Sequence, residues 1–511
     1  MRNYYFMRDD YDDYRPTAAQ RKRRREKRKM RRKILFTQWV FVALFAAMGT
    51  FICFYSLRYK RELYENSFNG RESKQLAQIT KGSILAADGS VLARTVENAD
   101  GTEMREYPYG NVFAHVVGYS DNGASGLEYD YSVETSTSSL SLSEKAALDE
   151  KGEKYGGDSV VTTLDPVIQQ AAYDAMGAYK GAIIVSDSKT GDILAMVSKP
   201  DFDPAKVAEN WTTYVNEDPT VGTLLNRVTQ GAYPPGSTFK IVDTIEYLKE
   251  HPDDWQNYSF DCTGDYIVDN YKIHCFHYEV HGEENLLQSF ANSCNCSFGN
   301  IGLSLDKDEW NSTMSGLLFN RDLPYDYTYN QSSVHLTDDT DTQETVQVAI
   351  GQGETSMSPL HMNLITNAVA NGGVLMNPRL VSAIDTAAGT TVKTYNTEEY
   401  GQLFDSWIAD ELCTMMRAVV TDGTATKLAD AAYEAAGKTG SAEYDASDET
   451  KSHAWFTGFA PVDDPQVSVT VIMEGGGSGG EVAVPAAKAV LDAYFAKHPE
   501  AASSAAVQGN E

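Results

Sequence analysis

Three short motifs carry residues that could form a nucleophilic site, and the first is Ser237-Thr238-Phe239-Lys240. It follows a Pro-Pro-Gly turn and begins an apolar helical pattern, so Ser237 and Lys240 would lie on one face of a helix. A serine hydroxyl is a weak nucleophile until a base takes its proton, and a desolvated lysine can be neutral enough to do so. Backbone N–H groups at a helix start would also stabilise a developing oxyanion. The pair is therefore a candidate nucleophile and base.

The second motif is Ser293-Cys294-Asn295, and the third is Lys438-Thr439-Gly440-Ser441. A second serine hydroxyl can relay protons, and a carboxamide can hold both a peptide bond and a lysine. A lysine followed by hydroxyl side chains can bind a substrate carboxylate, and a glycine between them lets a substrate backbone approach closely. These two motifs therefore supply a candidate relay and a candidate substrate-binding strand.

Each motif alone is weak evidence, because the sequence contains further matches. Ser186-Asp187-Ser188-Lys189 repeats the first pattern, Lys189-Thr190-Gly191 the third, and Ser67-Phe68-Asn69 and Ser120-Asp121-Asn122 the second. Lys189 would have to serve two motifs from a predicted hairpin turn, and both extra Ser-x-Asn triplets precede any candidate nucleophile. Only the three motifs described above occur in the order nucleophile, relay, strand, with gaps of 56 and 145 residues. The ordered set is the strong signal.

Charge is distributed very unevenly along the 511 residues, whose net charge is -29. Residues 1–33 hold 14 Lys/Arg and 5 Asp/Glu, so this segment carries +9 and the rest of the chain carries -38. Such an acidic body would repel nucleic-acid phosphates, which excludes nucleic-acid binding as a function. The basic segment suits an anionic membrane surface instead.

Residues 34–57 form a run of 24 uncharged, mostly apolar residues directly after the basic segment. As a helix the run is about 36 Å long, enough to cross a hydrocarbon core of about 30 Å. The preceding Lys/Arg residues place the N-terminus in the cytoplasm and the rest of the chain outside. The alternative is a cleaved signal peptide, but bulky residues continue past the small Ala46 and Ala47. We therefore expect a single-pass membrane anchor.

The helices and strands that must position the motifs fall into two regions of the chain, one before Val160 and one from Val160 onward. Residues 81–94 predict a hairpin around Asp88-Gly89, and residues 132–159 read as a surface loop or boundary with a helix near 142–150. From Val160 onward, strands at both ends of the region enclose helical and loop segments over 223–417, which predicts one mixed sheet built from distant segments and an α/β (α+β) fold. The expected strands are 181–185, 192–197, 454–459 and 467–473, and the flanking helices are 167–176 and 484–495.

The ordered motifs resemble those of the class B penicillin-binding proteins: S-x-x-K, S-x-N and K-[ST]-G. The resemblance extends from about residue 30 to about residue 495 and is strongest for the penicillin-binding protein A-like subgroup. Lys81 and Ala87 depart from the family, which often has arginines there, and Cys294 is an unusual middle residue. The matching flanks are YPPGSTFK (233–240), KGSILAADGSVLA (81–93), GLE (126–128), TTLDP (162–166), IGQG (350–353), ANGG (370–373) and HAWFTGFAP (453–461).

The resemblance implies a penicillin-recognising serine transpeptidase or β-lactamase-like domain, with a mixed sheet and a helical subdomain, on a small, mostly β pedestal. The implied divisions are a cytoplasmic tail (1–33), a transmembrane helix (34–57), a dimerisation-like pedestal (58–158), a transpeptidase domain (159–496) and a flexible tail (497–511). The implied location is a bacterial cell membrane, with the catalytic domain outside the cytoplasm.

The resemblance also implies roles for the motif residues in a peptidoglycan D,D-transpeptidase that β-lactams inhibit. Ser237 would attack the penultimate D-Ala carbonyl of a stem peptide ending in D-Ala-D-Ala, with Lys240 as base. Ser293 and Lys438 would pass a proton to the leaving amine. Asn295 would hold the stem peptide, Thr439 and Ser441 its carboxylate with Gly440 between them, and the N–H groups of Ser237 and Ser441 the oxyanion. No cofactor or metal is implied.

Other functions share the same motifs. A D,D-carboxypeptidase or a serine β-lactamase would let water resolve the acyl-enzyme, a β-lactam sensor would keep it, and a scaffold would not form it. The membrane anchor and the pedestal favour the transpeptidase. The sequence before Val160 leaves no room for a glycosyltransferase domain, so we expect a separate membrane polymerase of the SEDS type as partner.

Cysteine and histidine residues form a separate group, in which Cys262, His274, Cys275, His277 and His281 lie within 20 residues. Zinc ligation is conceivable, although the group contains no Cys-x-x-Cys pair. A location outside the cytoplasm favours a disulfide between Cys262 and Cys275, or packed thiols. Cys294 and Cys296 are two positions apart, so on a helix they would face different sides and not pair.

Overall fold

The computed structural model describes residues 17–58, 78–444 and 451–502, and it contains two compact units, Met1–Gln75 and Leu76–Glu511. The chain before residue 17, the Ser-x-Asn triplet at 67–69 and the end of the tail from 503 lie outside the described residues. The tail segment 497–502 is described and includes a short 3₁₀ turn, η8 (Pro499–Ala502). All three motifs belong to the second unit.

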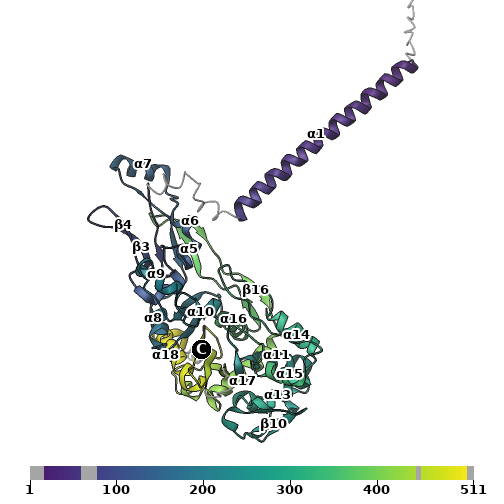
Figure 1. Ribbon diagram of the computed structural model, residues 1–511, viewed down its shortest axis with the longest axis vertical. Coiled ribbons are helices and arrows are strands. Elements are labelled where there is room, and N and C mark those ends of the chain that lie inside the picture. Colours follow the sequence, from purple (N-terminus) through teal and green to yellow (C-terminus); the bar gives the residue numbers. More distant parts are fainter. Residues whose placement is uncertain (1–16, 59–77, 445–450, 503–511) are drawn as a thin grey trace, which may run out of the picture. The chain divides into compact units, whose positions relative to one another are not determined.

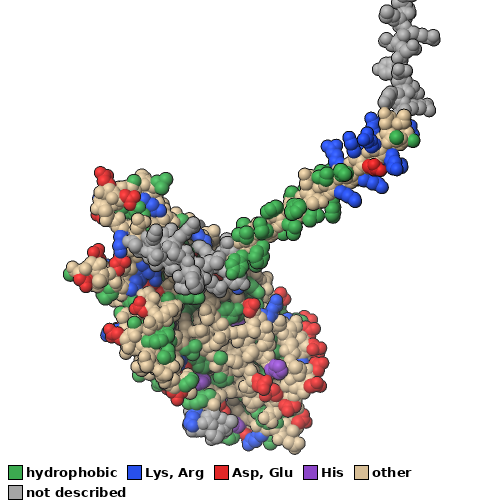
Figure 2. Space-filling model, turned by 45° about the horizontal axis from the view of Figure 1, so that its top comes forward, with side chains coloured by type: hydrophobic (Ala, Val, Ile, Leu, Met, Phe, Trp, Pro, Cys, Tyr) green, Lys and Arg blue, Asp and Glu red, His purple; other side chains and the backbone are tan. Residues whose placement is uncertain are grey.

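The described part of the first unit is one helix, α1 (Ala18–Arg58), of 41 residues. Figure 2 shows Lys and Arg side chains gathered on its first part and hydrophobic side chains along the rest. Its segment Ala18–Tyr55 has a mean hydropathy of 1.8 in its most apolar window. The helix is therefore long and apolar enough to serve as the predicted single-pass anchor.

A five-stranded sheet forms the centre of the second unit, in the order β17-β18-β19-β7-β8. The predicted strands are confirmed, and β17 carries the third motif. Every neighbouring pair is antiparallel, so the prediction that this sheet is mixed is wrong. Segments from both ends of the region pair here because hydrogen-bonding between strands does not require nearness in sequence. The strands are β7 (Gly181–Asp187), β8 (Ile193–Lys199), β17 (Ala436–Glu443), β18 (Ser452–Ala460) and β19 (Val467–Met473).

The two predicted flanking helices are confirmed as α8 (Pro166–Ala175) and α18 (Val484–Lys497), which pack against each other and against this sheet. Asp165 caps the start of α8 and Pro166 occupies its first turn, where a missing N–H costs nothing. The buried helix α16 (Pro359–Ala370) also packs on the sheet, where Asn363 donates hydrogen bonds to Ser468 and Thr470.

The pedestal contains a six-stranded sheet in the order β15-β14-β6-β2-β3-β4, and this is the mixed sheet, because β2 and β6 are parallel. The predicted hairpin is confirmed as β2 and β3. Three strands, β6, β14 and β15, come from beyond the predicted boundary at residue 158, because pairing with strands from distant segments leaves no local signal. The strands are β2 (Ile84–Leu85), β3 (Val91–Glu97), β4 (Glu103–Glu106), β6 (Ser159–Thr162), β14 (Val381–Asp385) and β15 (Thr391–Thr394).

Short helices complete the pedestal, and the helix predicted near 142–150 is confirmed as α7, with a capping box formed by Ser141 and Glu144. A parallel pair, β1 and β5, lies beside them. One apolar core continues from this part into the central sheet. The elements are α4 (Ala114–Val117), α5 (Gly126–Asp130), α6 (Ser132–Thr135), α7 (Leu142–Lys151), β1 (Ile79–Thr80) and β5 (Tyr155–Gly156).

Residues 223–417 contain the expected helices, but also small strand pairs that the sequence analysis missed. Helices α11, α13, α14 and α15 gather at the end of this unit opposite the pedestal (Figure 1). The helices are α9 (Val207–Val215, just before this region), α10 (Arg227–Gln230), α11 (Lys240–Glu250), α12 (Leu286–Ala291), α13 (Asn295–Ser304), α14 (Lys307–Gly316), α15 (Thr342–Ala349) and α17 (Ser406–Thr421). The strands are β9 (Phe260–Cys262), β10 (Asp265–Val268), β11 (Tyr271–His274), β12 (Gly282–Glu284), β13 (Val374–Met376) and β16 (Glu399–Gln402).

A buried ion-pair network holds the pedestal together at Glu128. Its carboxylate is fully buried and lies 2.6 Å from both Arg105 Nε and Lys81 Nζ. Arg105 also donates to the Gly82 carbonyl at 2.7 Å. The family often has an arginine at the position of Lys81. Lys81 therefore still places a positive charge next to the Glu128 carboxylate.

Replacing Glu128 is expected to destabilise the chain strongly, because Glu128→Gln leaves two partly buried cations without their counter-charge. We expect a loss of roughly 3–5 kcal/mol in the free energy of unfolding, measured by urea denaturation of the detergent-solubilised chain. The matched control is Glu106→Gln, which breaks the exposed pair with Arg94 and should cost less than about 1 kcal/mol. Equal losses in the two variants would contradict the assignment of Glu128 as the central charge.

Candidate active site

The first motif lies where a tight turn meets a buried helix. Ser237 is in the 3₁₀ turn η3 (Gly236–Phe239), and Lys240 is the first residue of α11 and fully buried. Gly236 has φ +54, and a Cβ there would lie only 3.0 Å from the Ala442 side chain of β17. Gly236 therefore lets the turn that carries Ser237 approach the strand that carries the third motif.

The second motif forms the connection between α12 and α13. Ser293 has a positive φ of 59, an uncommon left-handed conformation for a residue other than glycine. Its carbonyl oxygen accepts a hydrogen bond from Lys240 Nζ at 2.7 Å, and Asn295 Oδ1 accepts another at 2.8 Å. Asn295 Nδ2 in turn donates to the His274 carbonyl at 3.2 Å. Lys240 thus connects the first and second motifs.

The Ser293 hydroxyl is the point at which all three motifs meet. Lys438 Nζ, on β17 and fully buried, donates to Ser293 Oγ at 2.9 Å. Lys240 Nζ lies 3.3 Å from the same oxygen. Two lysines from distant segments therefore share one hydroxyl.

Burial of these amines changes their protonation. Removal from water lowers the pKa of Lys240 to about 8 and lowers the pKa of Lys438 well below its ordinary value, with the nearby Lys240 as a second cause for Lys438. Two ammonium groups at one hydroxyl would also repel each other. At least one of the two amines can therefore be neutral near physiological pH and accept a proton.

Six of the eight predicted site residues line one cleft of about 190 Å³, and the two lysines lie buried beneath it. Gly440 lies close to Pro235 and Trp455, so a Cβ there would be 3.1 Å from the Pro235 carbonyl oxygen. The structure thus brings all the predicted residues together. The six lining residues are Ser237, Ser293, Asn295, Thr439, Gly440 and Ser441.

Sequence analysis missed other residues of the cleft. The Thr424 hydroxyl lies 2.5 Å from that of Thr439, and Tyr271 and Gln352 also line the cleft. Gly351, which belongs to the IGQG flank, accepts the Gly236 N–H at 2.8 Å through its carbonyl oxygen and so supports the turn that carries Ser237. In the sequence, Gln352 is indicated only by its place in the IGQG flank of the family resemblance. Thr424 and Tyr271 lie in none of the motifs.

The competing motif matches in the described residues do not form a second site. Ser186 is buried in β7 and donates to Asn363, while Lys189 lies in the turn after β7 and pairs with Asp464. The Ser120-Asp121-Asn122 triplet lies in a pedestal loop. Their rejection on sequence context agrees with these positions.

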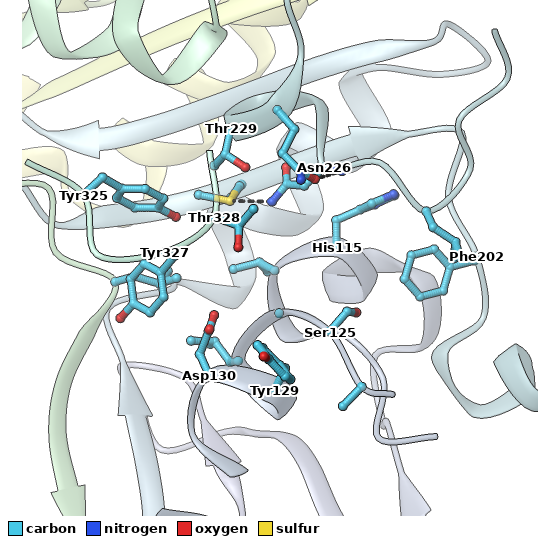
Figure 3. A pocket seen from close by; sticks show the side chains of 18 residues that line it. His115, Ser125, Tyr129, Asp130, Phe202, Asn226, Thr229, Tyr325, Tyr327 and Thr328 are labelled. Carbon is cyan, nitrogen blue, oxygen red and sulfur yellow. Dashed lines mark hydrogen bonds between the residues drawn. The ribbon is translucent and has the colours of Figure 1, made fainter. Parts of the chain in front are cut away.

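A second hollow, of about 250 Å³, lies between pedestal residues such as Ser125 and catalytic-region residues such as Asn226 and Tyr325 (Figure 3). His115 lies at its edge, where burial lowers its pKa to about 4, and its Nε2 is 2.9 Å from the Thr223 carbonyl oxygen. His115 is therefore a neutral, hydrogen-bonded structural residue, and none of the three motifs reaches this hollow.

The cysteine and histidine group forms a compact cluster behind the second motif. The Cys262 and Cys275 sulfurs are 3.7 Å apart, beyond the disulfide bond length of about 2.05 Å. Cys294 Sγ and Cys296 Sγ both approach Cys275, at 3.6 and 3.5 Å. Cys294 caps α13 from outside its first turn, so helical spacing does not separate the two side chains.

The remaining histidines of the group take different positions. His281 Nδ1 lies 3.4 Å from Cys262 Sγ and joins the cluster. His274 stacks its ring on Tyr278, and His277 is exposed. The candidate ligands named from sequence are therefore only partly those that the structure brings together.

Comparison with known proteins identifies relatives of both parts of the second unit. A peptidoglycan D,D-transpeptidase PbpA from Mycolicibacterium smegmatis is 30% identical over 460 residues, which cover 82% of this chain and 89% of that protein. A solved D,D-transpeptidase domain of a peptidoglycan glycosyltransferase from Eggerthella lenta has 31% identity and a TM-score of 0.74, covering 82% of this chain and 99% of that one. Penicillin-binding protein A from M. tuberculosis, solved as a penicillin G acyl-enzyme complex, has 26% identity and a TM-score of 0.74, covering 81% and 99%.

Family models agree with these relatives. The penicillin binding protein A dimerisation domain matches residues 81–160, and the penicillin binding protein transpeptidase domain matches residues 181–492. The predicted fold and family are therefore confirmed. The chain belongs to the penicillin-binding protein transpeptidase family.

Proposed function

We propose that this chain is a peptidoglycan D,D-transpeptidase that cross-links stem peptides through an acyl-enzyme at Ser237, and that β-lactams acylate the same serine. The observation that carries the proposal is the convergence of Lys240 and Lys438 on Ser293 beside Ser237 in one cleft. Names of relatives at about 30% identity support the same activity. The proposal extends to the roles of the individual site residues.

In the first step, Ser237 Oγ attacks the carbonyl carbon of the penultimate D-Ala, and its proton passes to the neutral Lys240 amine. The peptide C–N bond breaks, and the leaving D-Ala nitrogen takes a proton through Ser293 and Lys438. In the second step, an amine from a neighbouring stem peptide attacks the ester and loses a proton to the same groups. A new peptide bond forms, and Ser237 regains its proton, so the sequence is redox neutral.

The strand β17 and its neighbours would hold the donor peptide. Thr439 and Ser441 offer hydroxyls to its terminal carboxylate, and Asn295 offers an amide to its backbone. The backbone N–H groups of Ser237 and Ser441 would stabilise the oxyanion of the tetrahedral intermediate. Gly440 removes a side chain where the substrate backbone must approach.

We further propose that α1 anchors the chain in a bacterial cell membrane, with residues 1–33 in the cytoplasm and the catalytic domain outside. The functional divisions would be the pedestal at 58–158 and the transpeptidase domain at 159–496, although the two share one core. Because the reaction needs newly made glycan strands, a SEDS-type membrane polymerase is the proposed partner. Confinement in one bilayer lets a modest helix contact suffice for pairing.

Fluorescent penicillin is expected to label the detergent-solubilised chain at Ser237. Ser237→Ala should reduce labelling below about 1% of wild type, because Ser237 is the proposed nucleophile and the Ser293 hydroxyl is assigned to the proton path. The matched control is Ser186→Ala, which alters the competing Ser-x-x-Lys match and should leave labelling in place. A penicilloyl adduct on the Ser237→Ala chain, located by peptide mass spectrometry, would overturn the assignment.

The same adduct separates a transpeptidase from a hydrolase. A transpeptidase resolves its acyl-enzyme with an amine, so the penicilloyl adduct should persist. Rapid, repeated hydrolysis of a chromogenic cephalosporin would identify a β-lactamase instead. Release of D-Ala from a stem peptide without any cross-linked product would identify a carboxypeptidase.

The rate of penicillin acylation is expected to rise with pH between about 6 and 9, with its midpoint near pH 8, because Lys240 must be neutral to accept the Ser237 proton. Below its pKa the amine is protonated and cannot act as base, so acylation is slow there and reaches a plateau above it. Since the two lysines interact, the midpoint belongs to the pair. Stopped-flow acylation, with circular dichroism as a folding control, provides the measurement, and a flat profile would remove Lys240 as the base.

Replacing residues 34–57 with an unrelated spanning helix should retain penicillin labelling, because all three motifs lie beyond the anchor. We expect the exchanged chain to lose co-purification with a SEDS-type polymerase and to lose cell-wall cross-linking, because the native helix supplies the contact. Affinity purification and analysis of wall peptides measure the two losses. If both are unchanged, α1 is only a tether and the helix contact is wrong.

A further inference from the structure

Three sulfurs and one imidazole converge directly behind the Ser293-Cys294-Asn295 turn, and a fourth sulfur, Cys296 Sγ, lies 3.5 Å from Cys275 Sγ. Cys275 Sγ lies 3.7 Å from Cys262 Sγ and 3.6 Å from Cys294 Sγ, and His281 Nδ1 lies 3.4 Å from Cys262 Sγ. One ligand atom from each of the four residues lies within 4.8 Å of every other, and the three cysteines are buried. We propose that these four residues bind a zinc ion.

The spacing of the four atoms fits a tetrahedral ion. Zinc lies about 2.3 Å from thiolate sulfur and about 2.0 Å from imidazole nitrogen, so neighbouring sulfurs should be about 3.8 Å apart and a sulfur and a nitrogen about 3.5 Å. The distances of 3.6–3.7 and 3.4 Å are close to these values. A disulfide would use two of the sulfurs, at about 2.05 Å, and would leave the third sulfur and the imidazole unexplained.

Different elements bring the four ligands together. Cys262 ends β9, and its pairing partner Gly282 in β12 places the adjacent His281 beside it. Cys275 follows β11, and its N–H donates to the Gly264 carbonyl at 3.0 Å. Cys294 precedes α13. The small strands β9–β12 thus form a frame around the cluster.

The surroundings favour thiolates and a fixed imidazole. Cys294 Sγ accepts the Ser297 N–H at 3.4 Å at the start of the ten-residue helix α13, and a helix N-terminus stabilises a thiolate. The other ring nitrogen of His281 lies 3.9 Å from the Glu279 carboxylate, which is placed to orient the ring. Phe260 and Tyr266 cover the cysteines with apolar surface.

A bound zinc ion would act on the candidate active site as a positioning element. Cys294 stands between Ser293 and Asn295, and Cys275 follows His274, whose carbonyl accepts from Asn295 at 3.2 Å. Cys275 is therefore bonded to the residue whose carbonyl holds Asn295, and Cys294 is bonded to Asn295 itself. Cys294 also follows Ser293, whose backbone is left-handed. The ion would fix this turn without contacting the substrate.

The test is the metal content of the full chain, purified in detergent without chelator and measured by inductively coupled plasma mass spectrometry. We expect about one zinc per chain, and its loss in Cys275→Ser and in Cys294→Ser. Cys296→Ser is the near control and Cys413→Ser the distant one, and both should keep zinc. Zinc-free wild-type chain with a Cys262–Cys275 disulfide would overturn the proposal, as would zinc lost from Cys296→Ser but kept in Cys294→Ser.

A second measurement on the wild-type chain avoids dependence on variants that fail to fold. A strong chelator should remove the zinc, and alkylation mapped by mass spectrometry should then modify Cys262, Cys275 and Cys294, which zinc had protected. Adding Zn²⁺ alone should restore protection and also the rate of fluorescent penicillin labelling. Identical alkylation with and without chelator would contradict the site. Zinc protection without any effect on labelling would confirm the site and refute its positioning role.

Discussion

The arrangement depends on the burial of two lysine amines at one serine hydroxyl. In water both amines would be ammonium ions, and neither could take a proton from a serine. Inside the chain, Lys240 and Lys438 lose most of their hydration and donate to the same Ser293 oxygen. Burial therefore turns two ordinary cations into groups that can exchange protons near neutral pH.

The fold brings these amines together from distant segments. Lys240 begins a buried helix, whereas Lys438 belongs to a strand almost 200 residues later, and only the central sheet brings them together. Gly236, Gly351 and Gly440 permit the close approach between the nucleophile turn and β17. Cys294, next to Ser293, packs in the cluster of buried cysteines. Each motif thus has its own structural support, part of it from residues within the motifs, such as Gly440 and Cys294, and part from other segments, such as Gly351.

Sequence reasoning succeeded where the signal was local or ordered. The order of the three motifs selected Ser237, Ser293 and Lys438 over every competing match, and short apolar runs located four of the central strands. It failed where strands paired over long distances, because β6 gives no sign that β14 will join it from more than 200 residues away. The prediction that Cys294 and Cys296 do not pair with each other is confirmed, because both are free thiols. The facing argument behind it does not apply, because Cys294 caps α13 and both sulfurs lie near Cys275 Sγ. Thr424 lies in no motif and becomes a site residue only through its contact with Thr439.

The central claim is that an amine, and not water, resolves the acyl-enzyme formed by these groups. The most direct measurement supplies the full chain with a stem-peptide thioester as donor and a D-amino acid as acceptor, and quantifies the products by mass spectrometry. The account predicts a product in which the acceptor amine is joined to the donor carbonyl, in an amount that rises with acceptor concentration at the expense of the hydrolysed donor. Hydrolysed donor alone, at every acceptor concentration, would contradict it.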